Sequence, residues 1–157
     1  MPTIQKSMTI NAPVEAVEVV ANNPQRWAEW YAGILKAEPD ELFPEVGGVV
    51  AVTYQALGIE LDMKFTQLEY EPNRRSLTRI SGRIRGKNQI TLEAVKDGTL
   101  LTFQMGYKPP GGLIGRMVGR ALVNDILEEN LEVSLQQLKA IIENGPPNET
   151  THFPMEK

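Results

Sequence analysis

The sequence predicts an α+β fold in which a curved antiparallel sheet wraps around one long amphipathic helix. Three observations lead to this prediction. A segment with helical apolar periodicity, roughly 111–144, comes last and is followed by Gly145 and Pro146, residues that commonly end helices. Before it, residues 34–107 alternate between apolar and polar side chains with the period of a strand. One strand and two short helical segments open the chain, so helices and strands do not alternate regularly.

The opening elements are predicted from local signals. Residues 3–10 alternate in hydrophobicity and form the first strand. The segment NAPVEAVEVV then forms a short helix, which Asn11 or Ala12 caps and in which Pro13 occupies the first turn. In NNPQRWAEWY, Asn23 precedes a proline in the same way, which predicts a second short helix.

About six strands follow and complete the sheet. The segment ILKAEPDELF is irregular and belongs at an edge, because Pro39 has no N–H to donate to a neighbouring strand. In IELDMKF apolar and charged residues alternate, but the phase then slips, so that Leu68 and Tyr70 fall on the opposite parity. A β-bulge near Gln67 explains the slip and helps the sheet to curl.

Composition excludes several classes of site. The chain has 157 residues, no cysteine and a net charge of −4, so disulfides, thiolate metal sites and broad nucleic-acid binding are not expected. The only histidine, His152, lies in a polar tail, and we therefore expect no metal ion, no other cofactor and no Ser-His-Asp triad. No window approaches about 20 consecutive apolar residues, and the first residues lack the apolar core of a signal peptide. We expect no integral membrane association and a cytoplasmic protein.

The predicted long helix has an inward face whose two halves differ. Spacing at about 100° per residue places on this face Leu113, Met117, Arg120, Asn124, Leu127, Leu131, Leu135, Leu138 and Ile142. Its C-terminal half is apolar, whereas Arg120 and Asn124 interrupt the N-terminal half. Because burying an unpaired charge is costly, we interpret this half as the cover of a cavity, into which the two side chains reach. The alternative is a small phase drift at Gly115 and Gly119 that turns Arg120 toward solvent.

A second apolar stripe lies on the opposite side of this helix. It consists of Val118, Leu122, Ile126 and Val133. Either the short N-terminal helices cover this stripe, or a second copy of the chain does. A homodimer through the outer face of the helix is therefore one of two predictions.

The strand faces that should point toward the helix carry aromatic and methionine side chains. They are Tyr54, Met63, Phe65, Phe103, Met105 and Tyr107. Such a lining is typical of a pocket for a hydrophobic ligand, and methionines adapt to ligands of different shape. Ordinary core packing would account for many of the same positions. Trp27 and Trp30 either wall the mouth of the pocket or anchor a short helix in the core.

The segment RISGRIRGK is basic. It places Arg79, Arg83, Arg85 and Lys87 on one parity of its strands. These residues form either a patch for an anionic membrane or acidic partner, or part of a solvated outer sheet face. We favour the solvated face, with Glu60, Asp62 and Glu93 as cross-strand partners.

Two segments carry a resemblance to a known family. INAPVEAVEVVANNPQRWAEWY resembles the opening of the START-like, or SRPBCC, superfamily: a strand, Ala-Pro-x-x-x-Val, an Asn/Asp-x-Pro turn and a Trp-containing helix. DGTLLTFQMGYKPPGGLIGRMVGRAL with NLEVSLQQLK resembles the final hairpin and helix of its polyketide cyclase/dehydrase-like members. The resemblance covers Met8 to Glu143 and implies a helix-grip fold with a deep hydrophobic cavity. It predicts a single domain over residues 1–145, followed by a flexible tail over 146–157.

The resemblance also implies where a ligand enters. The loop before the long helix borders the cavity mouth in this family, so Pro109, Pro110, Gly111 and Gly112 would form an adjustable entrance. One departure concerns Glu18. Many members have Trp or Phe at this position, so a role for it as an aromatic lid is in doubt.

Three functional hypotheses remain open, because members of this superfamily include lipid carriers, hormone receptors, cyclases and co-chaperone domains. The first is a noncatalytic carrier or sensor of a small hydrophobic or amphipathic ligand, with Arg120 and Asn124 at its polar end. The second is a polyketide cyclase or dehydratase, with Tyr54, Tyr107 or Arg120, assisted by Asp125 or Glu128, as the available acid–base groups. The third is a co-chaperone-like interaction module that uses the outer face of the long helix.

Overall fold

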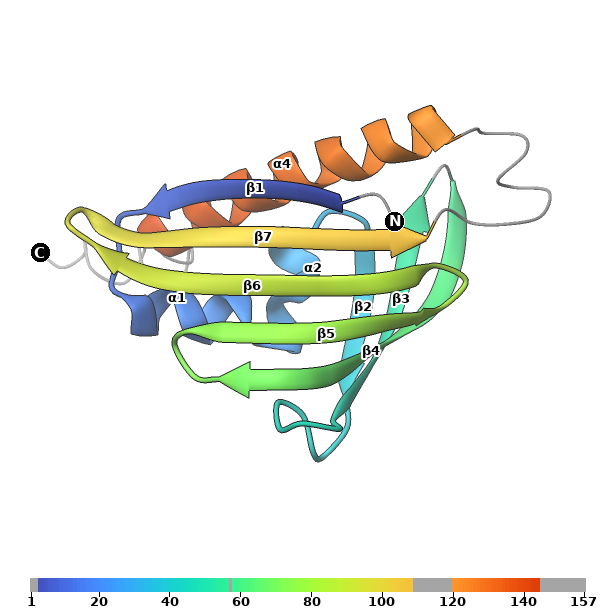
Figure 1. Cartoon of the computed structure of the whole chain (residues 1–157), viewed down its shortest axis with the longest axis horizontal. Coiled ribbons are helices and arrows are strands. Elements are labelled where there is room, and N and C mark those ends of the chain that lie inside the picture. The colour runs from blue at the N-terminus through green and yellow to red at the C-terminus, as the bar shows by residue number, and fades with distance from the viewer. Residues whose placement is uncertain (1–2, 57, 109–119, 145–157) are drawn as a thin grey trace, which may run out of the picture.

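The computed structural model describes residues 3–56, 58–108 and 120–144, with side chains in the last range from Asn124 onward. Its strands form one sheet with the helices on one side (Figure 1). The strands are β1 (Thr3–Ile10), β2 (Ile34–Pro39), β3 (Val49–Ala56), β4 (Ile59–Glu71), β5 (Arg75–Gly82), β6 (Arg85–Val95) and β7 (Gly98–Lys108). The helices are α1 (Val14–Ala21), the 3-10 turn η1 (Pro24–Arg26), α2 (Trp27–Trp30) and α4 (Arg120–Asn144). This order confirms the predicted α+β architecture.

The sheet is antiparallel throughout, with the order β1-β7-β6-β5-β4-β3-β2. β2 lies at one edge, as the position of Pro39 predicts, and its pairing with β3 is irregular between Ile34 and Lys36. In β4 the register shifts between Gln67 and Glu69, which confirms the predicted bulge. The sheet curves so strongly that β2 and β3 run across the direction of β6 and β7 in Figure 1.

The concave face of the sheet packs against the helices. From α4, Leu127, Leu131, Leu135 and Leu138 are buried, which confirms the predicted inward face over the described part of the helix. Ser134 on the same helix accepts a hydrogen bond of 2.8 Å from the backbone N–H of Ala32. The core therefore holds α4 against both the sheet and the segment that follows α2.

The predicted cap of α1 is wrong. Pro13 occupies the N-cap position with an extended backbone, and neither Asn11 nor Ala12 caps the helix with its side chain. A proline suits this position because its fixed φ matches the one required there and it has no N–H to satisfy. The backbone N–H of Asn11 instead donates to Glu143 Oε2 of α4, at 2.8 Å. The cap at Asn23 is confirmed, since its side chain accepts from Gln25 N at 3.1 Å.

Glu18 connects α1 to the β4–β5 turn. Its carboxylate accepts hydrogen bonds from Tyr70 Oη at 2.5 Å, from Asn22 Nδ2 at 2.8 Å and from the backbone N–H of Asn73 at 3.2 Å. Asn73 has a positive φ of 65°, so this bond also holds a backbone conformation that few residues adopt. Glu18 thus has a structural role in place of the aromatic residue common at this position.

Several predicted features lie outside the described residues: the start of the long helix at Gly111, the entrance residues 109–112, Leu113, Met117 and the tail 146–157. Arg120 is the first residue of α4, and its side chain is likewise not described. In the part of the chain that the structure describes, each helix is too short or too polar to pass through a lipid bilayer. The same residues include no group of three His, Cys, Asp or Glu side chains placed to hold a metal ion.

Candidate functional site

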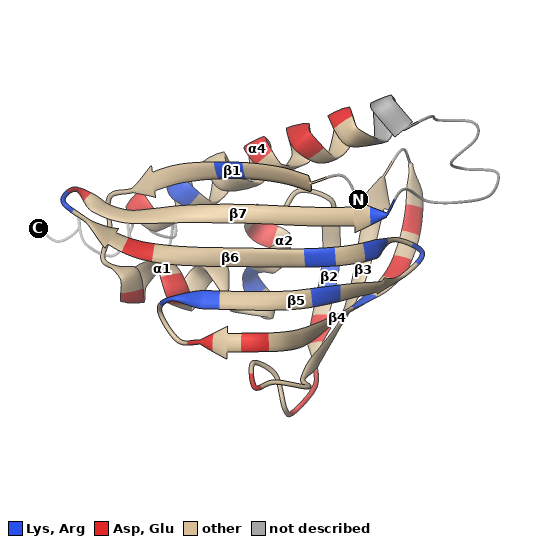
Figure 2. Ribbon diagram, in the orientation of Figure 1, with Lys and Arg blue, Asp and Glu red and all other residues tan. Residues whose placement is uncertain are grey.

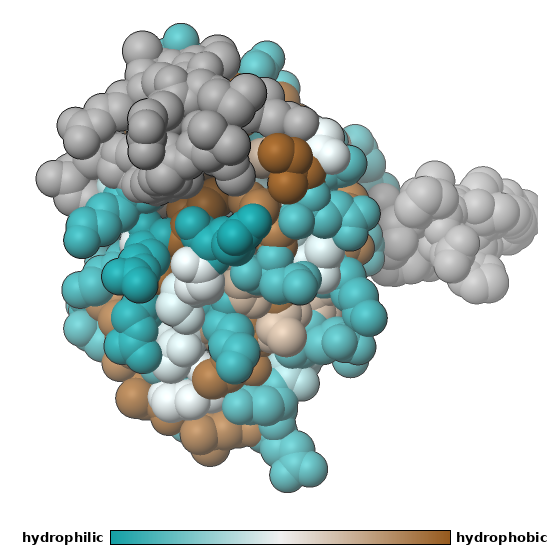
Figure 3. Space-filling model, turned by 90° about the vertical axis from the view of Figure 1, so that its right-hand side faces the viewer, coloured by the Kyte–Doolittle hydropathy of each residue, from teal (hydrophilic) through white to brown (hydrophobic). Residues whose placement is uncertain are grey.

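The candidate site lies inside the molecule, toward the end at which β7 stops and α4 begins. Figure 3 looks at this end and shows hydrophobic atoms at the surface, flanked by hydrophilic ones. Tyr107 near the end of β7, Tyr54 near the end of β3 and Asn124 near the start of α4 come from segments far apart in sequence. The fold brings all three toward the same end of the interior.

The predicted lining residues are buried. Those on the strands, Tyr54, Met63, Phe65, Phe103, Met105 and Tyr107, are at most 9% exposed, and Leu127 is also buried. Asn124 is half-buried. Burial is common to the cavity and the core-packing interpretations, so ligand contact by these residues stays a prediction.

Three tyrosines form hydrogen-bonded pairs with asparagines. The Tyr107 hydroxyl donates to Asn124 Oδ1 at 2.9 Å. Asn130 Nδ2 donates to the Tyr54 hydroxyl at 2.8 Å, which also joins the sheet to α4. The third pair consists of Tyr31 and Asn88, in which Asn88 Nδ2 donates to the Tyr31 hydroxyl at 2.8 Å. These phenol–amide pairs place polar groups in a mostly apolar interior.

Sequence reasoning missed the residues that complete these pairs. Asn88 has the strand parity of Ile90, opposite to that of the basic residues Arg85 and Lys87, and this signal could have identified it. Tyr31 directly follows α2, where strand or helix periodicity gives no direction. Asn130 lies beside the predicted inward face of α4, and only its partner Tyr54 shows its role.

Gly33 makes room for the Tyr54 ring. Its φ of 99° lies in the left-handed region, and a Cβ there would come within 2.4 Å of the ring. A side chain at this position would therefore strain the backbone and also displace Tyr54. Glycine is needed here to let the phenol lie against the chain beside Asn130.

The tyrosines of the interior are held in the neutral form. Burial raises the pKa of Tyr31 and of Tyr54. The pKa of Tyr107 is raised by burial and by the nearby Asp125 carboxylate. These phenols are therefore suited to hydrogen bonding rather than to acting as a base near neutral pH. Asp125 and Glu128 are exposed, and a role for either as an acid or base stays a prediction.

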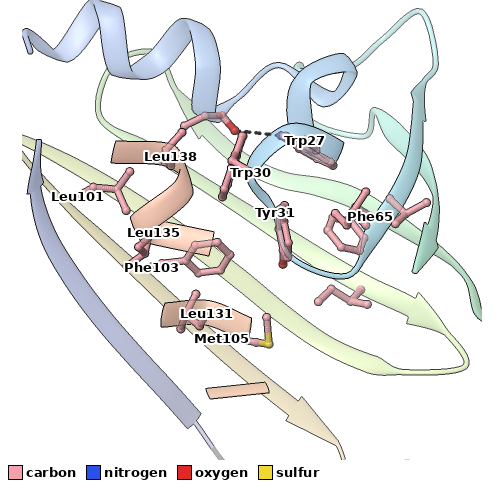
Figure 4. Packing of buried hydrophobic residues seen from close by; sticks show 14 of the residues in the cluster. Trp27, Trp30, Tyr31, Phe65, Leu101, Phe103, Met105, Leu131, Leu135 and Leu138 are labelled. Atoms are coloured by element: carbon pink, nitrogen blue, oxygen red, sulfur yellow. Dashed lines mark hydrogen bonds between the residues drawn. The ribbon is translucent and has the colours of Figure 1, made fainter. Parts of the chain in front are cut away.

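The two tryptophans lie in the core. Trp27 is 6% and Trp30 1% exposed, which agrees with the interpretation of both as anchors of a short helix. Figure 4 shows them beside Tyr31, with Phe65 on one side and Phe103 with the leucines of α4 on the other. The ring centroids of Trp27 and Phe65 are 5.6 Å apart, and those of Tyr31 and Phe103 are separated by the same distance. A buried pocket of about 20 Å³ lies among these rings and the inner faces of β5 and β6.

The basic segment is exposed, but the predicted cross-strand partners are wrong. Arg79 stands opposite Lys87, and Arg85 stands opposite Lys108. The predicted acidic partners pair with uncharged residues: Glu60 with Gln55, Asp62 with Thr53 and Glu93 with Leu100. Figure 2 shows the basic residues gathered toward one end of β5, β6 and β7. The register therefore places like charges opposite one another on the outer face.

Replacing Lys87 with glutamate is expected to stabilise the protein. The change converts a like-charge pair with Arg79 into an opposite-charge pair, and should raise the free energy of unfolding by about 0.5 kcal/mol at low salt. Urea denaturation with and without about 1 M salt measures the gain, which salt should reduce. Gln89→Glu is the matched control, because Gln89 lies on the same strand between Leu77 and Gln104. Equal effects of the two changes would contradict the prediction.

Comparisons with known proteins agree with this architecture. The crystal structure of TTHA0849 from Thermus thermophilus has a TM-score of 0.77 and 18% identity, covering 90% of this chain and 97% of that one. Protein CV1439 from Chromobacterium violaceum has a TM-score of 0.73 and 22% identity, covering 91% of this chain and 99% of that one. The solution structure of the Aha1 dimer from Colwellia psychrerythraea has a TM-score of 0.65 and 17% identity, covering 92% of this chain and 98% of that one. These likenesses show the helix-grip fold.

A search of curated proteins gave no significant match. The family model described as "Polyketide cyclase / dehydrase and lipid transport", however, matches residues 1–143, which is nearly all of the chain. This match agrees with the resemblance of the opening and closing motifs, and the chain therefore belongs to the polyketide cyclase/dehydrase and lipid transport family.

Proposed function

We propose that the protein binds a small hydrophobic or amphipathic molecule between the sheet and α4, and that it acts as a carrier or sensor without catalysing a reaction. The observation that carries the proposal is the set of phenol–amide pairs among buried apolar side chains. A few polar groups in an apolar interior are what orients a ligand in a pocket of this kind. Membership of a family that includes lipid transport supports the same class of ligand.

The pairs at the α4 end retain unused hydrogen-bond donors. Tyr54 accepts from Asn130, and its own O–H has no acceptor among the described residues. Asn124 accepts from Tyr107, and its Nδ2 has no acceptor in the same part of the chain. An oxygen acceptor on the ligand, such as a carbonyl, ester or ether, would satisfy these donors. In this proposal Arg120 and Asn124 hold the polar end of the ligand, and residues 109–112 form the entrance.

The catalytic alternative receives less support from the site. Proton transfer is most efficient when the pKa of the catalytic group lies near the working pH, whereas the pKa values of Tyr54 and Tyr107 are raised. On α4, the side chains of Asp125 and Glu128 are exposed rather than enclosed with the phenols. The phenols are better placed to bind an oxygen atom than to transfer a proton.

A homodimer through the outer face of α4 stays a prediction. Of the stripe that suggested it, Ile126 and Val133 are half-buried, which fits either cover by the chain's own helices or a partner. One protein of similar fold is described as a dimer. The ligand proposal does not depend on the outcome.

Native mass spectrometry of protein purified from its own host tests the proposed function. We expect a fraction of the molecules to carry one small apolar compound, which organic extraction then identifies. With the purified compound, Asn124→Leu should raise the Kd roughly 3- to 10-fold, the value of one hydrogen bond. Asp125→Asn, at the neighbouring exposed position, is the matched control. Protein that carries no compound, or equal Kd values for both variants, would contradict the proposal.

A further inference from the structure

The buried pocket beside α2 contains polar atoms that have not yet been given a role. Its roof is formed by the aromatic side chains that follow η1, including Trp30 and Tyr31, and its floor by inward residues of β5 and β6, including Thr78 and Asn88. The volume of about 20 Å³ is what one water molecule or one hydroxyl group needs. Such a pocket accommodates the end of a ligand rather than its body.

Trp30 lines this pocket and carries an unpartnered donor. The residue is 1% exposed, and its Nε1 has no hydrogen-bond partner among the described residues. The other tryptophan gives the contrast: Trp27 Nε1 donates to the carbonyl of Ala21 at 3.0 Å, drawn as a dashed line in Figure 4. A buried N–H without an acceptor is unfavourable, because it has lost its hydrogen bond to water. The free indole N–H therefore favours a bound acceptor in the pocket.

Asn88 presents the complementary group. It is 5% exposed and its Nδ2 donates to Tyr31, while its Oδ1 has no partner in the described part of the chain. If the amide is turned over, Oδ1 accepts from Tyr31 and Nδ2 becomes the unused atom. In both orientations one polar atom of Asn88 is left for the pocket. Asn88 and Trp30 therefore each offer one hydrogen bond to whatever occupies it.

The chemistry of the pocket selects a neutral hydroxyl group. A hydroxyl oxygen accepts from Trp30 and its hydrogen donates to Asn88 Oδ1, and in the turned amide the same oxygen accepts from both residues. A methyl group would satisfy neither. A carboxylate would bring an unpaired charge among buried rings, since no lysine or arginine is among the described residues that line the pocket. An alcohol or phenol is thus the ligand class that fits.

We propose that Trp30 and Asn88 form a buried hydroxyl-binding subsite, which takes a water molecule in the free protein and the hydroxyl group of an alcohol or phenol in the loaded protein. The ligand half of this inference rests on the proposed function, and the water half does not. The third phenol–amide pair, Tyr31 with Asn88, lines this pocket, so the body of a ligand seated here would extend toward Tyr54 and α4. The subsite therefore forms the deep end of the proposed cavity.

The water half is tested by nuclear magnetic resonance on the free protein. The chain has only two tryptophans, so its ¹⁵N spectrum contains two indole signals, which Trp27→Phe and Trp30→Phe assign. We expect the Trp30 indole proton to show a direct cross-peak with water, while that of Trp27, bonded to Ala21, shows none. A Trp30 signal without a water cross-peak would overturn this half.

The ligand half is tested with phenol and toluene, which differ mainly in a hydroxyl and a methyl group. We expect phenol to bind roughly 3- to 10-fold more tightly and to shift the Trp30 indole signal, and we expect Asn88→Leu to remove this preference. Equal affinity in the unmodified protein would overturn the subsite while leaving the cavity intact. Binding of neither probe would overturn the ligand half alone, because the proposed function is judged by the compound found in native mass spectrometry. Both comparisons use the unmodified protein and stand even if Asn88→Leu does not fold.

Discussion

Replacement of Phe103 by alanine is expected to lower the free energy of unfolding by about 4 kcal/mol. Phe103 on β7 is fully buried, and its ring packs edge-on against Tyr31 at 5.6 Å. Truncation removes the ring from between α4 and the aromatic side chains that follow η1, and it enlarges the pocket beside Trp30. Because the surrounding sheet is fixed by its ladder of backbone hydrogen bonds, the cavity can collapse only in part.

Urea denaturation followed by circular dichroism measures this loss. Gln104→Ala is the matched control, because Gln104 is the next residue on the same strand and points outward. Its replacement should change the free energy of unfolding by less than about 0.5 kcal/mol. Similar losses for the two variants would show that Phe103 does not hold the core together.

Stability is expected to fall steeply above about pH 10, the ordinary pKa of tyrosine. Burial raises the pKa of Tyr31 and Tyr54, so the unfolded chain loses these protons at a lower pH than the folded protein does. Stability from these groups is therefore fully present below about pH 10 and is lost as the pH rises toward the folded values. Each contributes a slope of about 1.4 kcal/mol per pH unit, or about 3 kcal/mol for the pair.

The pH dependence is separated from other alkaline effects by one variant. Tyr54→Phe removes one of these buried phenols, so the loss of stability above pH 10 should be about 1.4 kcal/mol per pH unit less steep. Urea denaturation over a series of pH values gives both slopes, and the absorbance of ionised tyrosine follows the titration. If the phenols ionise near pH 10 while the protein remains folded, the prediction is wrong.

The fold was largely predictable because its signals are local. The slip of phase after Phe65 predicted the β4 bulge, and Pro39 predicted an edge strand. The leucines from Leu127 to Leu138 predicted the inward face of α4. The cap of α1 was wrong because Asn11 and Pro13 both suit helix starts, and only the contact of Asn11 with Glu143 decides between them.

The candidate site was predictable only in part, because its polar contacts join distant segments. Tyr54 and Tyr107 followed from strand parity, but their amide partners depend on how α4 crosses the sheet. The pairing of Arg79 with Lys87 depends on the register of the β5–β6 hairpin. Hydrophobic alternation predicts which face of the sheet a side chain is on, but not which residue of the neighbouring strand lies opposite it.

The two borders of the sheet restrict how copies of this protein can associate. Three features of β2 interrupt the regular row of backbone groups that another chain could extend. They are the irregular pairing at Ile34, the proline at position 39 and the exposed ion pair between Lys36 and Glu38. On β1 the carbonyl of Thr9 accepts from Lys139 of α4 at 2.8 Å. Edges blunted in this way resist growth of a continuous intermolecular sheet. The folded protein is thereby protected against amyloid-like polymerisation.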